Sequence, residues 1–220
     1  GNHPAAMLAA PIDVSAAHSS PRPRPPIPHR PTAVHHATAA AIAPIPVAMA
    51  RSMMGLEVHA PYTLADMAGD ATGLLDALDI DKAHVVGLSM GAFATFYFGM
   101  EWPQRASSLT LAGIGSGSMP EARATFVCES ESAADALLAQ GWEKSARARG
   151  LTPTRVQFRN KDPRGFDEFL GMLRQHSAKG SSMTLKGYQA RRPALQDFAG
   201  QMAACTVPTL IVSGDEDWPC

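Results

Sequence analysis

The stretch His84-Val85-Val86-Gly87-Leu88-Ser89-Met90-Gly91-Ala92-Phe93 decides how this chain folds. A short apolar, β-branched run enters the pattern Gly-x-Ser-x-Gly, and a run compatible with a helix leaves it. This pattern predicts a sharp corner between a strand and a helix, with the serine exposed in a strained backbone conformation. Glycines on both sides of the serine allow the helix to fold back against the strand. We therefore expect Ser89 to carry a reactive hydroxyl, with the backbone N–H of Met90 directed at a developing oxyanion.

Because the Gly-x-Ser-x-Gly pattern is short, an ordinary surface serine between two glycines is the alternative interpretation. The neighbouring sequence favours the corner. Residues 63–79 form a one-sided helix, begun by a capping box of Thr63 and Asp66 and continued by apolar residues at helical spacing, namely Leu64, Met67, Ala71, Leu74, Leu75 and Leu78. Residues 84–88 are expected to form a buried strand, and residues 90–101 a helix packed on all sides.

The next apolar run, residues 107–112, predicts a second strand. Helix, strand, helix and strand at these spacings indicate a parallel sheet that is covered on both faces. The fold class that we expect is therefore α/β.

Helices alone are expected after the glycine-serine loop at residues 113–118. The first spans about 120–127, with Ser118 and Glu121 placed for a capping box, and a later one opens with Asp162 as N-cap and Pro163 in its first turn. The other helices are marked by Ala134, Leu137, Leu138 and Trp142, by Leu185 and Tyr188, and by Leu195, Phe198 and Met202. Residues 208–213 return to a buried strand, followed by the acidic turn Gly214-Asp215-Glu216-Asp217.

Residues 1–55 differ in composition from the rest of the chain. Ten prolines precede Pro61, and Phe, Tyr and Trp are absent from this segment. Such a composition buries too little apolar surface to offset the entropy of ordering the backbone, so it predicts disorder. Two alternatives stay open: translation from a non-native reading frame of GC-rich DNA, and a proline-rich ligand of an SH3-type domain at residues 23–26.

Composition excludes several classes of function. The formal net charge of −1 gives no electrostatic basis for binding nucleic acid or an anionic membrane, and no apolar run reaches the length of about 18 to 20 residues that a membrane span needs. The three cysteines, Cys128, Cys205 and Cys220, suit neither a disulfide framework nor a zinc site. We expect free thiols in a reducing compartment, hence a cytoplasmic location, with no metal and no cofactor.

Two motifs, residues 87–91 and 208–217, carry a resemblance to a known family. Through them the segment from about Pro61 to Cys220 resembles the α/β-hydrolase fold superfamily, in its capped serine hydrolase branch. The resemblance implies that this segment is the central part of such an enzyme. A disordered or non-native segment would occupy residues 1–55, the core 56–118 and 206–220, and an inserted helical cap 119–205. It also implies that Ser89 is the nucleophile, that Met90 supplies an oxyanion N–H, and that Asp217 is the triad acid, with Asp215 as the fallback; the alternative for these acids is a solvated turn.

Two parts of the family pattern are missing. The chain shows no strand with a catalytic histidine after Asp217, and no His-Gly oxyanion loop before residue 63. His84 begins the strand at the end opposite the corner and His176 lies on a cap helix, so neither is expected to be the base. The other histidines, His3, His18, His29, His35, His36 and His59, lie in sequence without expected order. We expect a weak or inactive hydrolase as written, with unpaired apolar strand edges that favour aggregation.

The expected activity of the intact enzyme is cleavage of an ester or related acyl bond in a small-molecule substrate. The candidate lining of an apolar pocket consists of aromatic residues of the cap, for each of which packing in the core of the cap is favoured over a place in the pocket: Phe126, Trp142, Phe166 and Tyr188. A non-catalytic binding protein with this fold is the alternative. The sequence leaves the substrate and the oligomeric state open.

Overall fold

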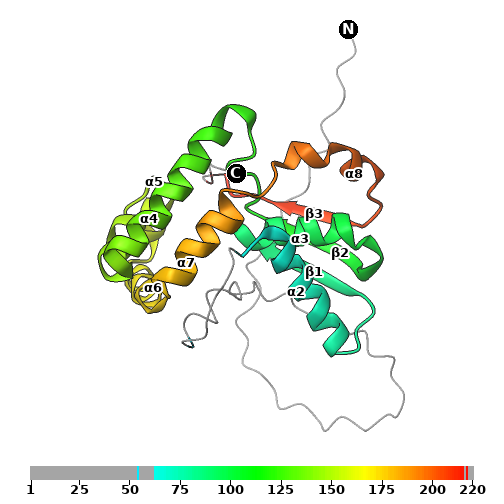
Figure 1. The fold of residues 1–220 in the computed structure, drawn as a ribbon, viewed down its shortest axis with the longest axis horizontal. Helices are drawn as coiled ribbons and strands as arrows, with labels where there is room; N and C mark the ends of the chain where they lie inside the picture. Colours follow the sequence, from blue (N-terminus) through cyan, green and yellow to red (C-terminus); the bar gives the residue numbers. More distant parts are fainter. Residues whose placement is uncertain (1–53, 55–61, 216, 218–220) are drawn as a thin grey trace, which may run out of the picture. The chain divides into compact units, whose positions relative to one another are not determined.

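A parallel sheet of three strands organises the described part of the chain, which comprises residues 54, 62–215 and 217 of the computed structural model. The strands are β1 (Ala83–Leu88), β2 (Ala106–Ala112) and β3 (Thr209–Val212), in the order β1-β2-β3. Both pairs are parallel, and Leu88 lies opposite Ala112 at the end of the first pair. The corner and the acidic turn therefore both follow the carboxyl ends of strands at one edge of the sheet (Figure 1).

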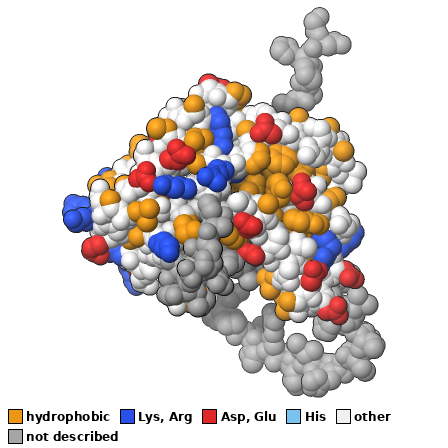
Figure 2. Space-filling view, viewed as in Figure 1, with side chains coloured by type: hydrophobic (Ala, Val, Ile, Leu, Met, Phe, Trp, Pro, Cys, Tyr) orange, Lys and Arg blue, Asp and Glu red, His pale blue; other side chains and the backbone are white. Residues whose placement is uncertain are grey.

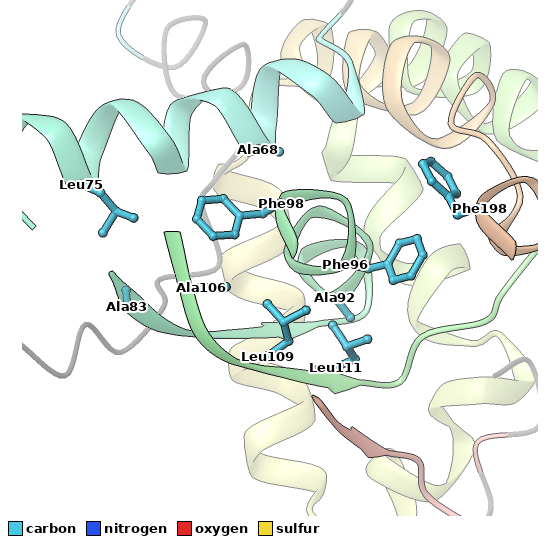
Figure 3. Packing of buried hydrophobic residues seen from close by; sticks show 10 residues of the cluster. All are labelled: Ala68, Leu75, Ala83, Ala92, Phe96, Phe98, Ala106, Leu109, Leu111 and Phe198. Atoms are coloured by element: carbon cyan, nitrogen blue, oxygen red, sulfur yellow. The ribbon is translucent and has the colours of Figure 1, made fainter. Parts of the chain in front are cut away.

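Two helices cover one face of this sheet. Helix α3 (Met90–Glu101) packs against β1 and β2, and α2 (Leu64–Ala77) packs on α3. Figure 3 shows this layering, with Phe96 and Phe98 of α3 between α2 and the strand residues Leu109 and Leu111. The members of this cluster are 0 to 7% exposed. The predicted all-round burial of α3 is confirmed, since most of its residues are buried.

The predicted burial of the strand at 208–213 was wrong, and that of the strand at 84–88 was wrong in part. All four residues of β3 are exposed, with Ile211 at 65%, and Val86 and Leu88 of β1 are exposed as well. Hydrophobic side chains accordingly gather at the surface around β3 (Figure 2). The physical reason is that, among the described helices, α2 and α3 lie on a single face of the sheet, whereas an apolar strand sequence indicates cover on both faces.

A group of helices separates β2 from β3 in the chain, and Figure 1 shows α4 to α7 together. They are α4 (Pro120–Gly150), α5 (Pro153–Lys161), α6 (Pro163–Gln175) and α7 (Ala178–Thr184), followed by the π-helix η2 (Leu185–Gln189). The short helices η3 (Leu195–Phe198) and α8 (Ala199–Ala204) lead into β3, and the 3-10 turn η1 (Pro103–Arg105) precedes β2. The predicted N-cap of α6 is confirmed, since Asp162 accepts a hydrogen bond from the N–H of Gly165.

Two predictions about the start of this helical segment were wrong. The predicted helix at 120–127 does not end there: α4 continues as far as Gly141, whose non-helical angles (φ 69°, ψ 176°) mark a kink where a second helical segment, with Trp142 at its start, begins. The capping box of Ser118 and Glu121 does not form, because Met119 is the N-cap residue. Pro120 takes the first helical position, which moves the helix start by one residue and removes the three-residue spacing that the box requires.

The capping box of α2 is present as predicted. The side chain of Thr63 accepts from the N–H of Asp66 at 3.2 Å, and the Asp66 carboxylate accepts from the N–H of Thr63 at 2.8 Å. We predict that Thr63→Ala lowers the free energy of unfolding by about 1 kcal/mol, because an N-terminal N–H loses its acceptor. Urea denaturation measures the change, and Thr63→Ser is the control that keeps the hydroxyl. Equal stability of the two variants would contradict the role of the cap.

Candidate active site

Ser89 occupies the corner between β1 and α3 in a backbone conformation that non-glycine residues rarely adopt. Its φ is 52° and its ψ is −113°. Hydrogen bonds hold the residue on both sides: its N–H donates to the carbonyl of Ala112 at 2.8 Å, and its carbonyl accepts from the N–H groups of Ala92 and Phe93 at 2.9 and 3.3 Å. The side chain is exposed. A strained, over-determined backbone with an accessible hydroxyl is the arrangement that presents a nucleophile to a substrate.

Glycine at position 87 permits the close approach of helix to strand that this corner needs. A Cβ at residue 87 would lie 2.2 Å from the carbonyl oxygen of Gly91 and 2.5 Å from Oγ1 of Thr95. No side chain fits in that gap, so α3 can lie directly on β1 only when residue 87 is glycine. Met90 is the first residue of α3, where a backbone N–H has no acceptor within the helix. This N–H is available to an oxyanion at the corner.

Asp217 lies at the same edge of the sheet as Ser89. Its N–H donates to the carbonyl of Gly214 at 3.1 Å, which closes the turn after β3. Its carboxylate is next to Gly113, where a Cβ would come within 3.2 Å of Oδ2. Gly113 itself follows β2 with a φ of +57°, and its N–H donates to the carbonyl of Val212 at 2.8 Å. Of the two candidate acids, Asp217 is half-buried and Asp215 is exposed.

The segment that follows α7 contacts the corner through Tyr188 and Arg192. Tyr188 is fully buried, and its hydroxyl donates to the carbonyl of Met90 at 2.5 Å. Arg192 is only 2% exposed, and its guanidinium lies over the ring of Phe93 at 3.5 Å from the centroid. It also donates to the carbonyl of Ser116. Sequence reasoning missed Arg192, because two adjacent arginines are typical of a solvated surface and nothing in their spacing indicates burial.

The four aromatic candidates for the pocket differ in their surroundings. Trp142 packs with Leu137 and Ala146, and its Nε1 donates to Oγ of Ser181 at 3.0 Å. Phe166 is buried beside the rings of other cap residues, Phe158 and Phe169, with centroids 5.8 and 6.4 Å away. These contacts lie within the group of helices α4 to α7, where core packing is the alternative role for both residues.

Phe126 and Tyr188 are linked to α3 by contacts that Trp142 and Phe166 do not show. Phe126 is half-buried, and the Arg192 guanidinium that covers Phe93 is also 5.0 Å from the centroid of its ring. Tyr188 contacts Met90 directly. Of the four candidates, these two therefore have contacts to α3 or to a residue that contacts it.

Neither described histidine is placed to act on Ser89. His84 is the second residue of β1, at the end opposite the corner, and its Nδ1 lies 2.7 Å from Oγ of Ser108. His176 caps the end of α6 and packs edge-on against Trp142, with ring centroids 5.9 Å apart. The six histidines of residues 1–61 lie outside the described residues, as do the expected disorder and the proline-rich motif.

A described cavity of about 430 Å³ lies at the end of the sheet where β1 begins, lined by Leu75, Asp76, Asp79, Ile80, Asp81, Lys82, Gln104 and Arg105. Arg105 neutralises part of this acidic lining through an ion pair of 2.7 Å with Asp76. No group of metal-ligating side chains occurs among the described residues. Within residues 62–215, no helix has the length and apolar character to cross a membrane.

The corner predicts a stability difference between two glycine substitutions. Gly87→Ala places a methyl group against the carbonyl of Gly91, so α3 must shift, and we expect a loss of about 1 to 3 kcal/mol in the free energy of unfolding. Gly69→Ala in α2 is the matched control, because nothing lies within 4 Å of the added Cβ. It should change stability by less than about 1 kcal/mol, in the stabilising direction. Urea denaturation compares them, and equal stabilities would argue against the close approach.

The position of His176 predicts a pH dependence of stability. Burial lowers the pKa of His176 below its ordinary value of 6.5, so the folded chain binds this proton less readily than the unfolded chain. Its contribution to stability is therefore present above pH 6.5 and is lost as the pH falls through the lowered pKa. We expect the fall in melting temperature between pH 7.5 and pH 5.5 to be smaller in His176→Gln than in the wild type. An unchanged fall in His176→Gln would refute the assignment.

Comparison with known proteins agrees with this geometry. The family model of the alpha/beta hydrolase fold matches residues 12–219. Over 162 residues the chain is 26% identical to 3-oxoadipate enol-lactonase 1 of Acinetobacter baylyi, covering 70% of this chain and 54% of the relative. A shorter match of 45 residues is 47% identical to 2-hydroxy-6-oxononadienedioate/2-hydroxy-6-oxononatrienedioate hydrolase 1 of Pseudomonas putida, covering 20% of this chain and 16% of the relative.

A solved structure shows the same fold. A thermophilic esterase from Thermogutta terrifontis, solved with malate bound, superposes with a TM-score of 0.58 at 25% identity, covering 72% of this chain and 56% of that chain. The chain thus spans about half the length of the enol-lactonase and of this esterase. The strained serine between strand and helix, the parallel sheet and the family match over residues 12–219 together show that this chain belongs to the α/β-hydrolase fold family.

Proposed function

We propose that this protein is a serine hydrolase that cleaves an ester or related acyl bond through a covalent acyl-enzyme. The observation that carries the proposal is the backbone of Ser89, whose φ of 52° holds an exposed hydroxyl on the corner. A relaxed surface serine has no reason to occupy this region, which costs on the order of 1 to 3 kcal/mol. The surrounding hydrogen bonds from β2 and α3 offset that cost, as expected where strain serves chemistry.

Each neighbour of Ser89 has a proposed role. Oγ of Ser89 attacks the acyl carbon, and the N–H of Met90 stabilises the oxyanion that forms. A histidine takes the proton of the hydroxyl and then delivers it to the leaving alcohol, and water releases the acyl group by the same steps. Asp217 holds that histidine in the required tautomer. Because His84 and His176 lie elsewhere, we place the histidine outside the described residues.

The proposed substrate is a small acyl compound held between the corner and the helical cap. Two similar proteins support ester-type chemistry by their names, an enol-lactonase and an esterase. The division into a core of residues 56–118 and 206–220 and a cap of residues 119–205 is part of the proposal. Contacts of Tyr188 and Arg192 with α3 support it, because they seat the cap over the corner. The roles assigned to Ser89, Met90 and Asp217 call for no metal or cofactor.

A fluorophosphonate probe tests the proposal on the full-length protein. We expect the probe to label the wild type and not Ser89→Ala, because phosphonylation requires the serine oxygen. Turnover of a p-nitrophenyl ester should fall on the order of 10⁴-fold or more in Ser89→Ala and about 10⁴-fold in Asp217→Asn. Asp215→Asn is the matched control, at an exposed position in the same turn, and should retain activity.

Two outcomes would redirect the proposal. Absence of labelling in a folded wild-type protein would favour a non-catalytic binding protein with this fold. Loss of activity in Asp215→Asn with retention in Asp217→Asn would move the acid to residue 215.

A further inference from the structure

We propose that Tyr188, a residue of the helical cap, positions the oxyanion-binding N–H of Met90 by hydrogen-bonding the first turn of α3. The inference rests on the proposed function and extends it, since it gives a cap residue a part in the geometry of the reaction. Tyr188 touches no reacting atom in this scheme. It acts through the backbone of Met90.

The phenolic oxygen of Tyr188 reaches the first turn of α3. It donates its proton to the carbonyl of Met90 at 2.5 Å. In the helix this carbonyl also accepts from the N–H of residue 94, and a carbonyl oxygen has lone pairs for two hydrogen bonds. Because α3 begins at Met90, the bond from Tyr188 adds a second constraint to the first turn of the helix, at the residue whose N–H faces the proposed oxyanion.

The surroundings of Tyr188 fix the direction of this hydrogen bond. The side chain is 0% exposed and packs with residues of α2 and α3, namely Leu64, Met67, Phe93 and Ala94, and with Tyr62. Burial raises the pKa of Tyr188, although the positive charge of Arg192 and the Ala94 N–H oppose the shift. The phenol is therefore neutral at any pH where an ester hydrolase works, and it carries the proton that a carbonyl acceptor requires.

The backbone on the cap side is also fixed. Tyr188 lies in the π-helix η2, which is closed by a hydrogen bond of 2.9 Å from the Ala190 N–H to the Leu185 carbonyl. The carbonyl of Tyr188 accepts from the N–H of Arg192 at 2.8 Å. Arg192 in turn lies over Phe93, three residues after Met90. The phenol reaches α3 from a segment that touches the same helix at a second point.

The hydrogen bond from Tyr188 to Met90 matters because the backbone at the corner does not favour its observed conformation by itself. Ser89 has a positive φ, so local energetics favour a different orientation of the peptide that joins it to Met90. That peptide carries the oxyanion N–H, and the carbonyl bound by Tyr188 belongs to the next peptide along the chain. Holding this second peptide limits rotation about both backbone dihedrals of Met90. The side chain of Tyr188 therefore couples the position of the cap to the orientation of the Met90 N–H that would bind the oxyanion.

Tyr188→Phe in the full-length protein tests the inference, with Tyr97→Phe as the matched control. Tyr97 is half-buried on α3 itself, so its variant removes a hydroxyl from the same helix without touching Met90. We expect Tyr188→Phe to lower kcat for a p-nitrophenyl ester by about 10- to 100-fold, as a misplaced donor does, with KM within about twofold of wild type. Tyr97→Phe should keep both constants. Amide hydrogen exchange should quicken at Ala94, whose N–H meets the Met90 carbonyl in the helix, in Tyr188→Phe only.

A measurement on the wild type covers the case in which Tyr188→Phe fails to fold. The Tyr188 hydroxyl should give a slowly exchanging proton resonance with a nuclear Overhauser effect to the amide of Ala94. Absence of that resonance, or unchanged kcat and unchanged exchange in a folded Tyr188→Phe protein, overturns the inference. A rise in KM at constant kcat also overturns it, because it assigns Tyr188 to substrate binding. Loss of the proposed function has a different signature, namely no Ser89-dependent turnover in the wild type.

Discussion

The close contact between β1 and α3 at the corner is the constraint on which the rest of the structure depends. The absence of a Cβ at residue 87 lets the helix approach to the point where an added methyl would lie 2.2 Å from a backbone oxygen. The hydrogen bond from the Ser89 N–H to the Ala112 carbonyl then ties the corner to β2. A second hydrogen bond, from the Gly113 N–H to the Val212 carbonyl, ties β2 to β3. The carboxyl ends of all three strands are thereby held in one row.

That row explains how residues far apart in the sequence reach one edge of the sheet. Ser89 follows β1, Gly113 follows β2 and Asp217 follows β3, and in a parallel sheet these ends must lie side by side. The carboxylate of Asp217 can approach Gly113 because no side chain occupies that position. The helical segment leaves the sheet at the same edge, after β2, and returns through Tyr188 and Arg192 to contact α3.

Local sequence signals predicted those elements whose causes are local. The Thr63 and Asp66 box and the Asp162 cap depend on contacts within a few residues, and both form as predicted. The start of α4 was missed, although its cause is local too, because Pro120 competes with Ser118 for the helix start and wins through its fixed φ. The exposure of β3 was missed for another reason. Apolar β-branched residues indicate that a strand is suited to burial. Whether the strand is buried depends on which other elements pack against it.

The sequence alone determined the corner between strand and helix, because a serine between two glycines, after a strand and before a helix, leaves the backbone one way to turn. It also determined the parallel order of strands, through their spacing and the helices between them. Only the tertiary structure decided which aromatic and charged side chains of the helical segment between β2 and β3 reach α3. Tyr188 and Arg192 come within bonding distance of a helix nearly 100 residues earlier in the chain, the Tyr188 hydrogen bond to Met90 having a sequence separation of 98. No periodicity or motif encodes such a contact, because its energy comes from the packing of two segments that are neighbours in space alone.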